Sequence, residues 1–141
     1  MAGRSVLIVD DNELNLRLAE TVLNHAGFDV HVARNAAEAR DRLAERQWSA
    51  VLMDLRLPDG NGLDIVRELR ADPSRSTTRV AALTASAMVG DPQQAFDAGC
   101  NAYISKPIEV RTFAEEVRSL IDRPEGASAG PAPFSKPTAL A

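Results

Sequence analysis

Short, continuous apolar segments alternate along the chain with segments in which apolar residues recur every three to four positions. A continuous apolar segment is typical of a strand buried on both faces of a parallel sheet, because a strand with one exposed face would alternate apolar and polar residues. The sequence predicts five such strands, at residues 5–10, 28–32, 50–54, 80–84 and 102–105. Each is too short to be a helix of ordinary length.

Amphipathic helices are predicted between and after these strands. In the first, Leu14, Leu18, Val22 and Ala26 recur at helical spacing, and Gly27 follows as the C-terminal cap. The other four are a helix behind an Asn35/Glu38 capping box that ends near Arg46, one with Ile65, Val66 and Leu69 on its apolar face, one from Asp91-Pro92 to Gly99, and one striped by Phe113, Val117, Leu120 and Ile121. This alternation predicts an α/β fold, a single five-stranded parallel sheet flanked by five helices, doubly wound with right-handed crossovers.

The chain divides into one predicted domain, residues 1–123, and a tail, residues 124–141. A length of 141 residues suits one ordinary domain. The tail holds four of the eight prolines but only two charged side chains, Glu125 and Lys136. Its Pro/Ala/Ser/Gly composition cannot build a core, so the tail is expected to be disordered.

Composition excludes several classes of protein. The 16 basic residues stand against 20 acidic ones, a net charge of −4, which argues against a nucleic-acid partner. No apolar run approaches the ~20 residues of a membrane span, and the start MAGRSVLIVDDNE lacks a signal-peptide layout. The single cysteine, Cys100, cannot form an internal disulfide, and no Cys/His cluster has zinc spacing. A soluble, cytoplasmic protein is expected, without a membrane partner.

Polar residues follow the predicted strands at the edge where ligands of open parallel sheets collect. The strand ends carry Asp10-Asp11, Asp54, Thr84 and Ser105-Lys106-Pro107. Any one of them alone is ordinary turn, cap or surface chemistry, and only their joint occurrence indicates a site. Three neighbouring carboxylates repel, so one must be protonated or a cation must join them. Oxygen ligands favour Mg²⁺ or Mn²⁺, and a hydroxyl and a lysine beside them suit phosphate. Lys106 is one of only two lysines among the 16 basic residues.

Four stretches carry a family resemblance, namely VLIVDDNELN, AVLMDLRLPDGNG, ALTASAM and NAYISKPI. Together they cover residues from about 5 to 122, in an order that is more specific than any one of them. The chain resembles the receiver domain of bacterial two-component response regulators, and most of all the DivK-type single-domain regulators. Receivers attached to hybrid sensor kinases are nearly as similar.

The resemblance implies a role for each strand-end carboxylate. Asp54 would be the phosphoacceptor. Asp10 and Asp11 would hold Mg²⁺, with Asp54 itself and the backbone carbonyl of Arg56 completing the protein ligands. Asp59 and Asp64, which also lie in or near the loop after Asp54, are expected to be loop and cap residues.

The resemblance also implies a set of switch residues. Thr84 would donate its hydroxyl to the phosphoryl group, Lys106 would pair with it, and Tyr103 would be the aromatic side chain that changes position. The peptide bond before Pro107 would be cis, which X-Pro bonds allow at low energetic cost.

The implied partners are a histidine kinase or a histidine phosphotransfer protein, and a downstream protein that reads the surface of the fourth helix, fifth strand and fifth helix. Two alternatives within the family stay open: a phosphate sink without its own output, and a receiver cut from a hybrid kinase. The start MAGR and the alanine-rich tail favour a complete short protein. A phosphatase of the haloacid-dehalogenase class is disfavoured, because it needs a second Asp where Arg56 stands.

Overall fold

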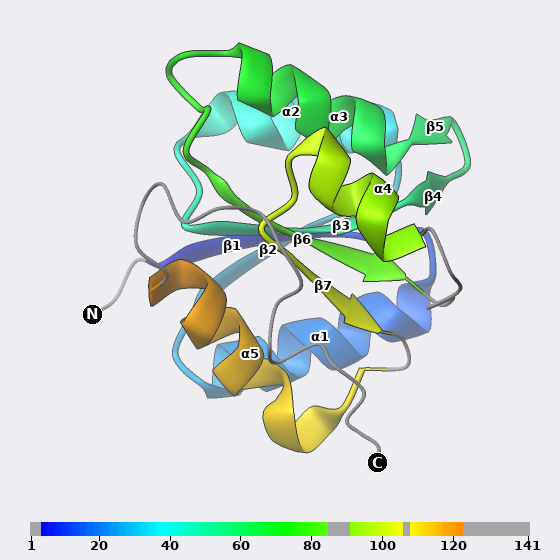
Figure 1. Ribbon diagram of the computed structural model, residues 1–141. Helices are drawn as coiled ribbons and strands as arrows, with labels where there is room; N and C mark the ends of the chain where they lie inside the picture. The colour runs from blue at the N-terminus through cyan, green and yellow to red at the C-terminus, as the bar shows by residue number, and fades with distance from the viewer. Residues whose placement is uncertain (1–3, 85–90, 106–107, 123–141) are drawn as a thin grey trace.

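The structure of the protein, a computed structural model, describes residues 4–84, 91–105 and 108–122. A five-stranded parallel sheet with strand order β2–β1–β3–β6–β7 forms its centre (Figure 1). Its strands are β1 (Ser5–Val9), β2 (Asp29–Ala33), β3 (Ala50–Asp54), β6 (Arg79–Thr84) and β7 (Ala102–Ser105). The helices of the described part are α1 (Glu13–His25), α2 (Ala36–Glu45), α3 (Gly62–Ala71), α4 (Asp91–Ala98) and α5 (Val110–Asp122). The predicted α/β architecture is confirmed.

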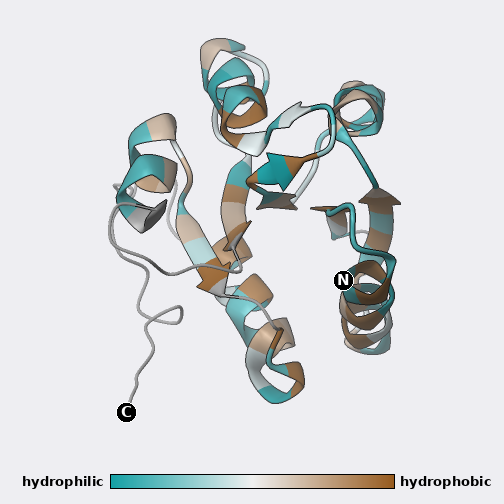
Figure 2. Ribbon diagram, turned by 90° about the vertical axis from the view of Figure 1, so that its right-hand side faces the viewer, coloured by the Kyte–Doolittle hydropathy of each residue, from teal (hydrophilic) through white to brown (hydrophobic). Residues whose placement is uncertain are grey.

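The helices form two layers, with α1 and α5 on one face of the sheet and α2, α3 and α4 on the other (Figure 1). Strand β1 is continuously apolar because it is buried on both faces of the sheet. Leu7 and Val9 belong to the core under α2, α3 and α4, while Val6 and Ile8 belong to the core under α1 and α5. In Figure 2 the hydrophobic colour covers much of the central strands, whereas the helices carry both hydrophobic and hydrophilic colours.

The sheet brings the ends of its strands to one edge. Val9 pairs in register with Met53, so Asp10 and Asp54 both follow that pair directly in the chain. Asp54 pairs with Leu83, the residue before Thr84, and Thr84 pairs in turn with Ser105. The registers therefore align all the predicted strand-end residues of the described part along a single edge.

The second strand begins one residue later than the pattern predicts, at Asp29 rather than Phe28. The reason is the end of α1, where Gly27 has a φ of 99°. The amide of Phe28 donates to the carbonyl of Leu23 (3.1 Å), and the amide of Gly27 donates to that of Asn24 (3.0 Å). This is the Schellman arrangement, in which the residue after the glycine closes the helix and is therefore not free to pair in a sheet.

The segment 55–62, predicted as a loop, contains a two-stranded antiparallel hairpin. Its strands are β4 (Arg56–Leu57) and β5 (Gly60–Asn61). Strands of two residues leave no periodicity in the sequence, which is why the pattern indicates only a turn. The hairpin directly connects Asp54 to the start of α3.

Some predictions fall outside the described residues. These are the tail 124–141, Lys106, and the cis peptide bond at Pro107. Within the described ranges, no helix combines the length and the apolar character that crossing a membrane requires.

Candidate functional site

Three carboxylates meet at the carboxyl edge of the sheet. Asp10, Asp11 and Asp54 each offer an oxygen atom, and these three oxygens lie within 4.8 Å of one another. Asp10 is completely buried and Asp54 is 6% exposed, while Asp11 is exposed to solvent. The structure thus brings together the acidic residues that the sequence predicts to form one site. We call these three residues the acid cluster.

Asp10 is fixed by the turn between β1 and α1. The amide of Asn12 donates to its Oδ1 (2.9 Å), and Nδ2 of Asn15 donates to its Oδ2 (3.3 Å). Asn12 is also the N-cap of α1, because its side chain accepts from the amide of Asn15 (3.0 Å). The start of the helix and the orientation of the buried carboxylate therefore depend on the same two asparagines.

Asp54 is fixed by the chain that follows it. The amide of Arg56 donates to Asp54 Oδ1 (3.1 Å), and the amide of Gly62 donates to the carbonyl of Leu55 (3.0 Å). The chain leaves Asp54, forms the hairpin and returns at Gly62, so the first turn of α3 packs directly against the strand end. The side chain of Arg56 is exposed, and its backbone adjoins the phosphoacceptor predicted from the sequence.

Of the remaining predicted site residues, the structure describes the backbone of Thr84 and the whole of Tyr103. The backbone of Thr84 ends β6 beside the residue that pairs with Asp54. Tyr103 is buried under α4, and its ring meets that of Phe96 in a T-shaped contact, with centroids 6.0 Å apart and planes at 73°. Lys106 lies outside the described residues, although Ser105 before it pairs with Thr84.

The acid cluster offers a donor set that fits a hard divalent cation. It contains carboxylate oxygens alone, and two of the three carboxylates are removed from solvent. Mg²⁺ takes carboxylate oxygens and keeps several waters, which suits a cluster that is open to solvent at Asp11. A cation of this kind would also relieve the mutual repulsion of the three charges.

Several residues that shape this edge were not predicted as functional. Asn12 and Asn15 orient Asp10, and Gly62 allows the close return of the chain at Asp54. Asp59, predicted as a loop residue, accepts hydrogen bonds from the first turn of α2. The DDNELN and DGNG segments contain the first three residues and could have indicated them, whereas the partner of Asp59 lies 23 positions away and leaves no local pattern.

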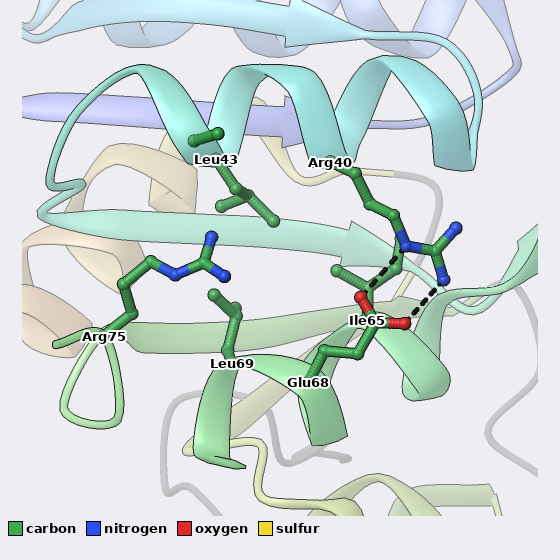
Figure 3. Close-up of a pocket in the computed structure, with 7 residues that line it drawn as sticks. Arg40, Leu43, Ile65, Glu68, Leu69 and Arg75 are labelled. Carbon is green, nitrogen blue, oxygen red and sulfur yellow. Dashed lines mark hydrogen bonds and ion pairs between the residues drawn. The ribbon is translucent and has the colours of Figure 1, made fainter. Parts of the chain in front are cut away.

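A hollow lies between α2 and α3, away from the acid cluster, with a cavity of about 190 Å³. Figure 3 shows Arg40 reaching from α2 to Glu68 on α3 across this hollow, with two hydrogen bonds of 2.9 and 2.7 Å. Leu43, Ile65 and Leu69 form its apolar part. None of the lining residues belongs to the acid cluster, so this hollow contributes no group to the candidate site.

Comparison with known proteins agrees with this geometry. The family model described as "response regulator receiver domain" matches residues 6–118. The chain is 40% identical over 118 residues to the polar-differentiation response regulator DivK of Brucella anthropi, a match covering 84% of this chain and 96% of that one.

Solved structures show the same relationship. The receiver domain of a sensor histidine kinase from Pseudomonas aeruginosa, with a magnesium ion coordinated in its active-site cleft, is 31% identical with a TM-score of 0.79, covering 86% of this chain and 100% of that one. A CheY-like receiver domain protein from Methanospirillum hungatei is 26% identical with a TM-score of 0.78, covering 86% and 95%. The chain therefore belongs to the response regulator receiver domain family, whose fold is flavodoxin-like and whose members are signalling switches.

Proposed function

We propose that the protein is a single-domain response regulator of a two-component phosphorelay, which accepts a phosphoryl group on Asp54 and signals through phosphorylation-dependent contact with another protein. The observation that carries the proposal is the acid cluster, with its three carboxylate oxygens within 4.8 Å at the carboxyl edge of a receiver-type sheet. The sequence similarity to DivK supports a regulator without a further domain. The same similarity leads us to propose that the protein is cytoplasmic.

The residues proposed to hold Mg²⁺ are Asp10, Asp11, Asp54 and the backbone carbonyl of Arg56. Mn²⁺ would suit the same oxygen donors. When bound, the ion neutralises oxygen charge on the phosphoryl group and favours its in-line approach to the carboxylate. Asp10 contributes a charge whose direction is fixed by Asn12 and Asn15, and Asp11 contributes one that can adjust because it is exposed.

Asp54 is the nucleophile in the proposed reaction. An oxygen of its carboxylate forms a bond to phosphorus while the bond from phosphorus to the imidazole nitrogen of the donor phosphohistidine breaks, and that nitrogen keeps the electron pair. Positioning supplies much of the catalysis in such transfers. The hydrogen bond from the Arg56 amide and the tight return at Gly62 hold Asp54 in place without the partner.

The acyl phosphate places oxygens carrying up to about two negative charges beside Asp10 and Asp11. We assign Thr84 and Lys106 to the phosphoryl oxygens, since the register of β3, β6 and β7 aligns their strand ends beside Asp54. Inward movement of Thr84 would leave room behind it for Tyr103, which lies two positions back on the neighbouring strand, opposite Ala82. The cis peptide bond at Pro107 remains part of this proposal.

The proposed readout surface consists of α4, β7 and α5. Its buried link to the site is Tyr103, which contacts Phe96 of α4. A change at Tyr103 would therefore bias the position of α4, and a downstream protein would read the difference. Catalysis in this proposal is limited to the protein's own phosphorylation and dephosphorylation, with a histidine kinase or histidine phosphotransfer protein as the donor.

The decisive experiment uses acetyl phosphate, a small donor that needs no partner. The intact mass should rise by one phosphate in the presence of Mg²⁺, and it should not rise with a chelator. Asp54→Asn should abolish labelling, whereas Asp64→Asn, a matched change at an exposed carboxylate on α3, should leave it intact. Equal labelling of wild type and Asp54→Asn would refute the site.

A second experiment separates a regulator with an output from a phosphate sink. Protein phosphorylated with acetyl phosphate and the Asp54→Ala variant are used as baits for the same cell extract. Proteins retained by the phosphorylated bait alone identify an output. Rapid turnover of the phosphoryl group with no such protein would favour the sink, and a receiver cut from a hybrid kinase would be recognised by transfer from its own kinase.

A further inference from the structure

Residues 34–37, which comprise the connection after β2 and the first two residues of α2, contact the start of α1, just after the loop that carries Asp10 and Asp11. Arg34 donates from Nε to Glu13 Oε1 (2.9 Å) and from Nη2 to Glu13 Oε2 (3.2 Å). Glu13 is the first residue of α1, two positions after Asp11. This hydrogen bond lowers the pKa of Glu13. The planar guanidinium thus holds the start of α1 through a two-point contact.

The same connection contacts the hairpin that follows Asp54. Asp59, at the turn of the hairpin, accepts from the amide of Ala36 at Oδ1 (2.7 Å) and from the amide of Ala37 at Oδ2 (3.1 Å). The side chain of Asn35, the N-cap of α2, accepts from the amide of Glu38 (2.8 Å). Asp59 therefore serves two first-turn amides that the helix's own cap does not reach. These amides, that of Ala36 first, lower the pKa of Asp59.

The hairpin is held by this contact together with the buried side chain of Leu57. Its two strands have two residues each, and an isolated hairpin even of ordinary length is marginally stable. It starts where the amide of Arg56 donates to Asp54 Oδ1 (3.1 Å). Only five positions separate Asp54 from Asp59, so a displaced hairpin tip would move the backbone at Arg56 and, with it, the hydrogen bond to Asp54.

We propose that residues 34–37 form a bracket that holds the two loops of the acid cluster at their working separation, with Asp59 as the positioning residue on the hairpin side and Arg34 on the α1 side. We call this segment the α2 bracket. The inference rests on the proposed function, because the working separation is that of Mg²⁺ binding and phosphoryl transfer. It adds to that function a determinant of metal affinity outside the acid cluster.

The test compares three variants of the full chain by Mg²⁺ titration calorimetry at 25 °C. Asp59→Ala removes both acceptors and should weaken Mg²⁺ binding about 10-fold, the lower end for residues that orient metal ligands. Asp59→Asn keeps one acceptor and should fall between Asp59→Ala and wild type. Asp64→Asn is the control for charge alone, since Asp64 bonds only to Arg67 among the hydrogen bonds of the described residues.

Asp64 is a suitable control because it lies in electrostatic surroundings similar to those of Asp59, as their common effect on Arg40 shows. The pKa of Arg40 is raised mainly by its hydrogen bond to Glu68, and both Asp59 and Asp64 add to the shift. Equal weakening in all three variants would mean that lost charge, not lost positioning, controls the affinity, and would overturn the bracket. An unchanged Mg²⁺ affinity in Asp59→Ala, together with a lower melting temperature, would reduce Asp59 to a helix cap and overturn it too.

Amide hydrogen exchange without metal tests the bracket independently of the proposed function. In Asp59→Ala the amides of Arg56, Ala36 and Ala37 should exchange faster than in wild type, and in Asp64→Asn they should not. If wild type fails to bind Mg²⁺, the proposed function is wrong. Hydrogen exchange would then still show whether Asp59 holds the hairpin in position. If protection at Arg56 is the same in Asp59→Ala and wild type, the hairpin holds its own position and the bracket is wrong.

Discussion

A Cβ atom on Gly62 would overlap the backbone carbonyl oxygen of Asp54. The same atom would lie 2.8 Å from Cγ of Met53 and 3.1 Å from the carbonyl carbon of Asp54. Gly62 is the first residue of α3, and its buried position lets the helix start directly against the end of β3. The glycine is needed here for a close approach of two backbones, one of which carries Asp54, the proposed phosphoacceptor.

Gly62→Ala should therefore disturb both the fold and the site. The backbone of Asp54 must move, because the atom that the new Cβ would overlap is a backbone carbonyl oxygen. The end of a flexible side chain could rotate away, but a carbonyl oxygen cannot. We expect a loss of about 1–3 kcal/mol in the free energy of unfolding, and acetyl phosphate labelling at least about 10-fold slower. Gly60→Ala is the control, since its Cβ would meet Cβ of Ala36 at an ordinary 3.6 Å. If both variants label at the wild-type rate, the close approach has no part in positioning Asp54.

Asp11→Asn should separate metal binding from folding. Asp11 is exposed, whereas Asp10 is buried and hydrogen-bonded to Asn12 and Asn15. Without metal, the variant should melt at the wild-type temperature or slightly above it, because one of three repelling charges is gone. Mg²⁺ should raise the melting temperature of wild type by linkage and should raise that of the variant much less.

The measurement is thermal melting across a Mg²⁺ series, with Asp64→Asn as an exposed-carboxylate control. The control should respond to Mg²⁺ as wild type does. An Asp11→Asn curve that coincides with wild type at every Mg²⁺ concentration would remove Asp11 from the proposed ligands.

Leu14 is expected to contact the protein that donates the phosphoryl group. It is 76% exposed on the first turn of α1, three positions after Asp11, so a protein that brings a phosphohistidine to the acid cluster would have to approach close to it. Leu14→Ala should slow phosphotransfer from the cognate phosphohistidine protein about 10-fold, because truncation of a hydrophobic anchor costs at least about 1 kcal/mol at an interface. Labelling by acetyl phosphate should not change.

Leu14→Met serves as the conservative variant and should retain most of the transfer, because Met offers similar apolar area. The measurement is the initial rate with a fixed concentration of phosphorylated donor. Equal slowing with acetyl phosphate and with the protein donor would assign the defect to the acid cluster rather than to docking.

The sheet and its ligand edge could be predicted because both follow from pattern and topology. Val6, Leu7, Ile8 and Val9 are all apolar because successive side chains enter different cores. Once the strands are parallel, their last residues must share an edge, which is why Asp10 and Asp54 were expected to meet across 44 positions of sequence.

The parts that could not be predicted depend on contacts without a local signature. Asp59 caps a helix that begins 23 positions earlier, and nothing near Asp59 indicates that partner. The hairpin has strands too short for any period, and Phe28 leaves β2 only because its amide closes α1. Pattern indicates which strand residues are buried, whereas these features depend on where single polar groups find their acceptors.

Arg70 should contribute more to stability than the exposed arginines of the described residues do. It donates to four neutral oxygens: Gly99 O (2.9 Å), Thr78 O (2.7 Å), Ser76 O (3.0 Å) and Asn101 Oδ1 (2.9 Å). The contacts join the end of α3 to the connections before β6 and after α4. Burial lowers the pKa of Arg70, so the charge depends on these acceptors for its solvation.

Arg70→Met keeps much of the side-chain volume and removes every donor. We expect a loss of about 2–4 kcal/mol in the free energy of unfolding, because one buried and three half-buried acceptors lose this donor. Arg70→Lys should lie between Arg70→Met and wild type, since an ammonium cannot reproduce the fork. Urea unfolding provides the measurement, with Arg67→Met as the exposed control on the same helix. A loss below about 1 kcal/mol in Arg70→Met would contradict the structural role.

Glu116 should make the stability of the protein fall as the pH rises. Burial, with a smaller contribution from the charge of Glu109, raises the pKa of Glu116 from 4.5 to about 7. Below pH 4.5 the carboxyl is protonated in both the folded and the unfolded chain. Between pH 4.5 and about 7 the unfolded chain ionises while the folded one keeps its proton, so unfolding becomes more favourable as the pH rises.

Glu116→Gln should remove this loss, because glutamine is neutral in both states and similar in shape to the protonated carboxyl. The free energy of unfolding of the variant should equal that of wild type near pH 4.5. The difference in favour of the variant should grow up to about pH 7 and stay constant above that pH. The full shift would correspond to about 3 kcal/mol. Solvent screening at this half-buried side chain lowers the expected difference in the free energy of unfolding to about 1 kcal/mol. Glu109→Gln should give a part of this stabilisation, because it removes the neighbouring charge. Urea unfolding of the three proteins at several pH values provides the measurement. A constant difference between Glu116→Gln and wild type across this range would mean that Glu116 ionises alike in both states.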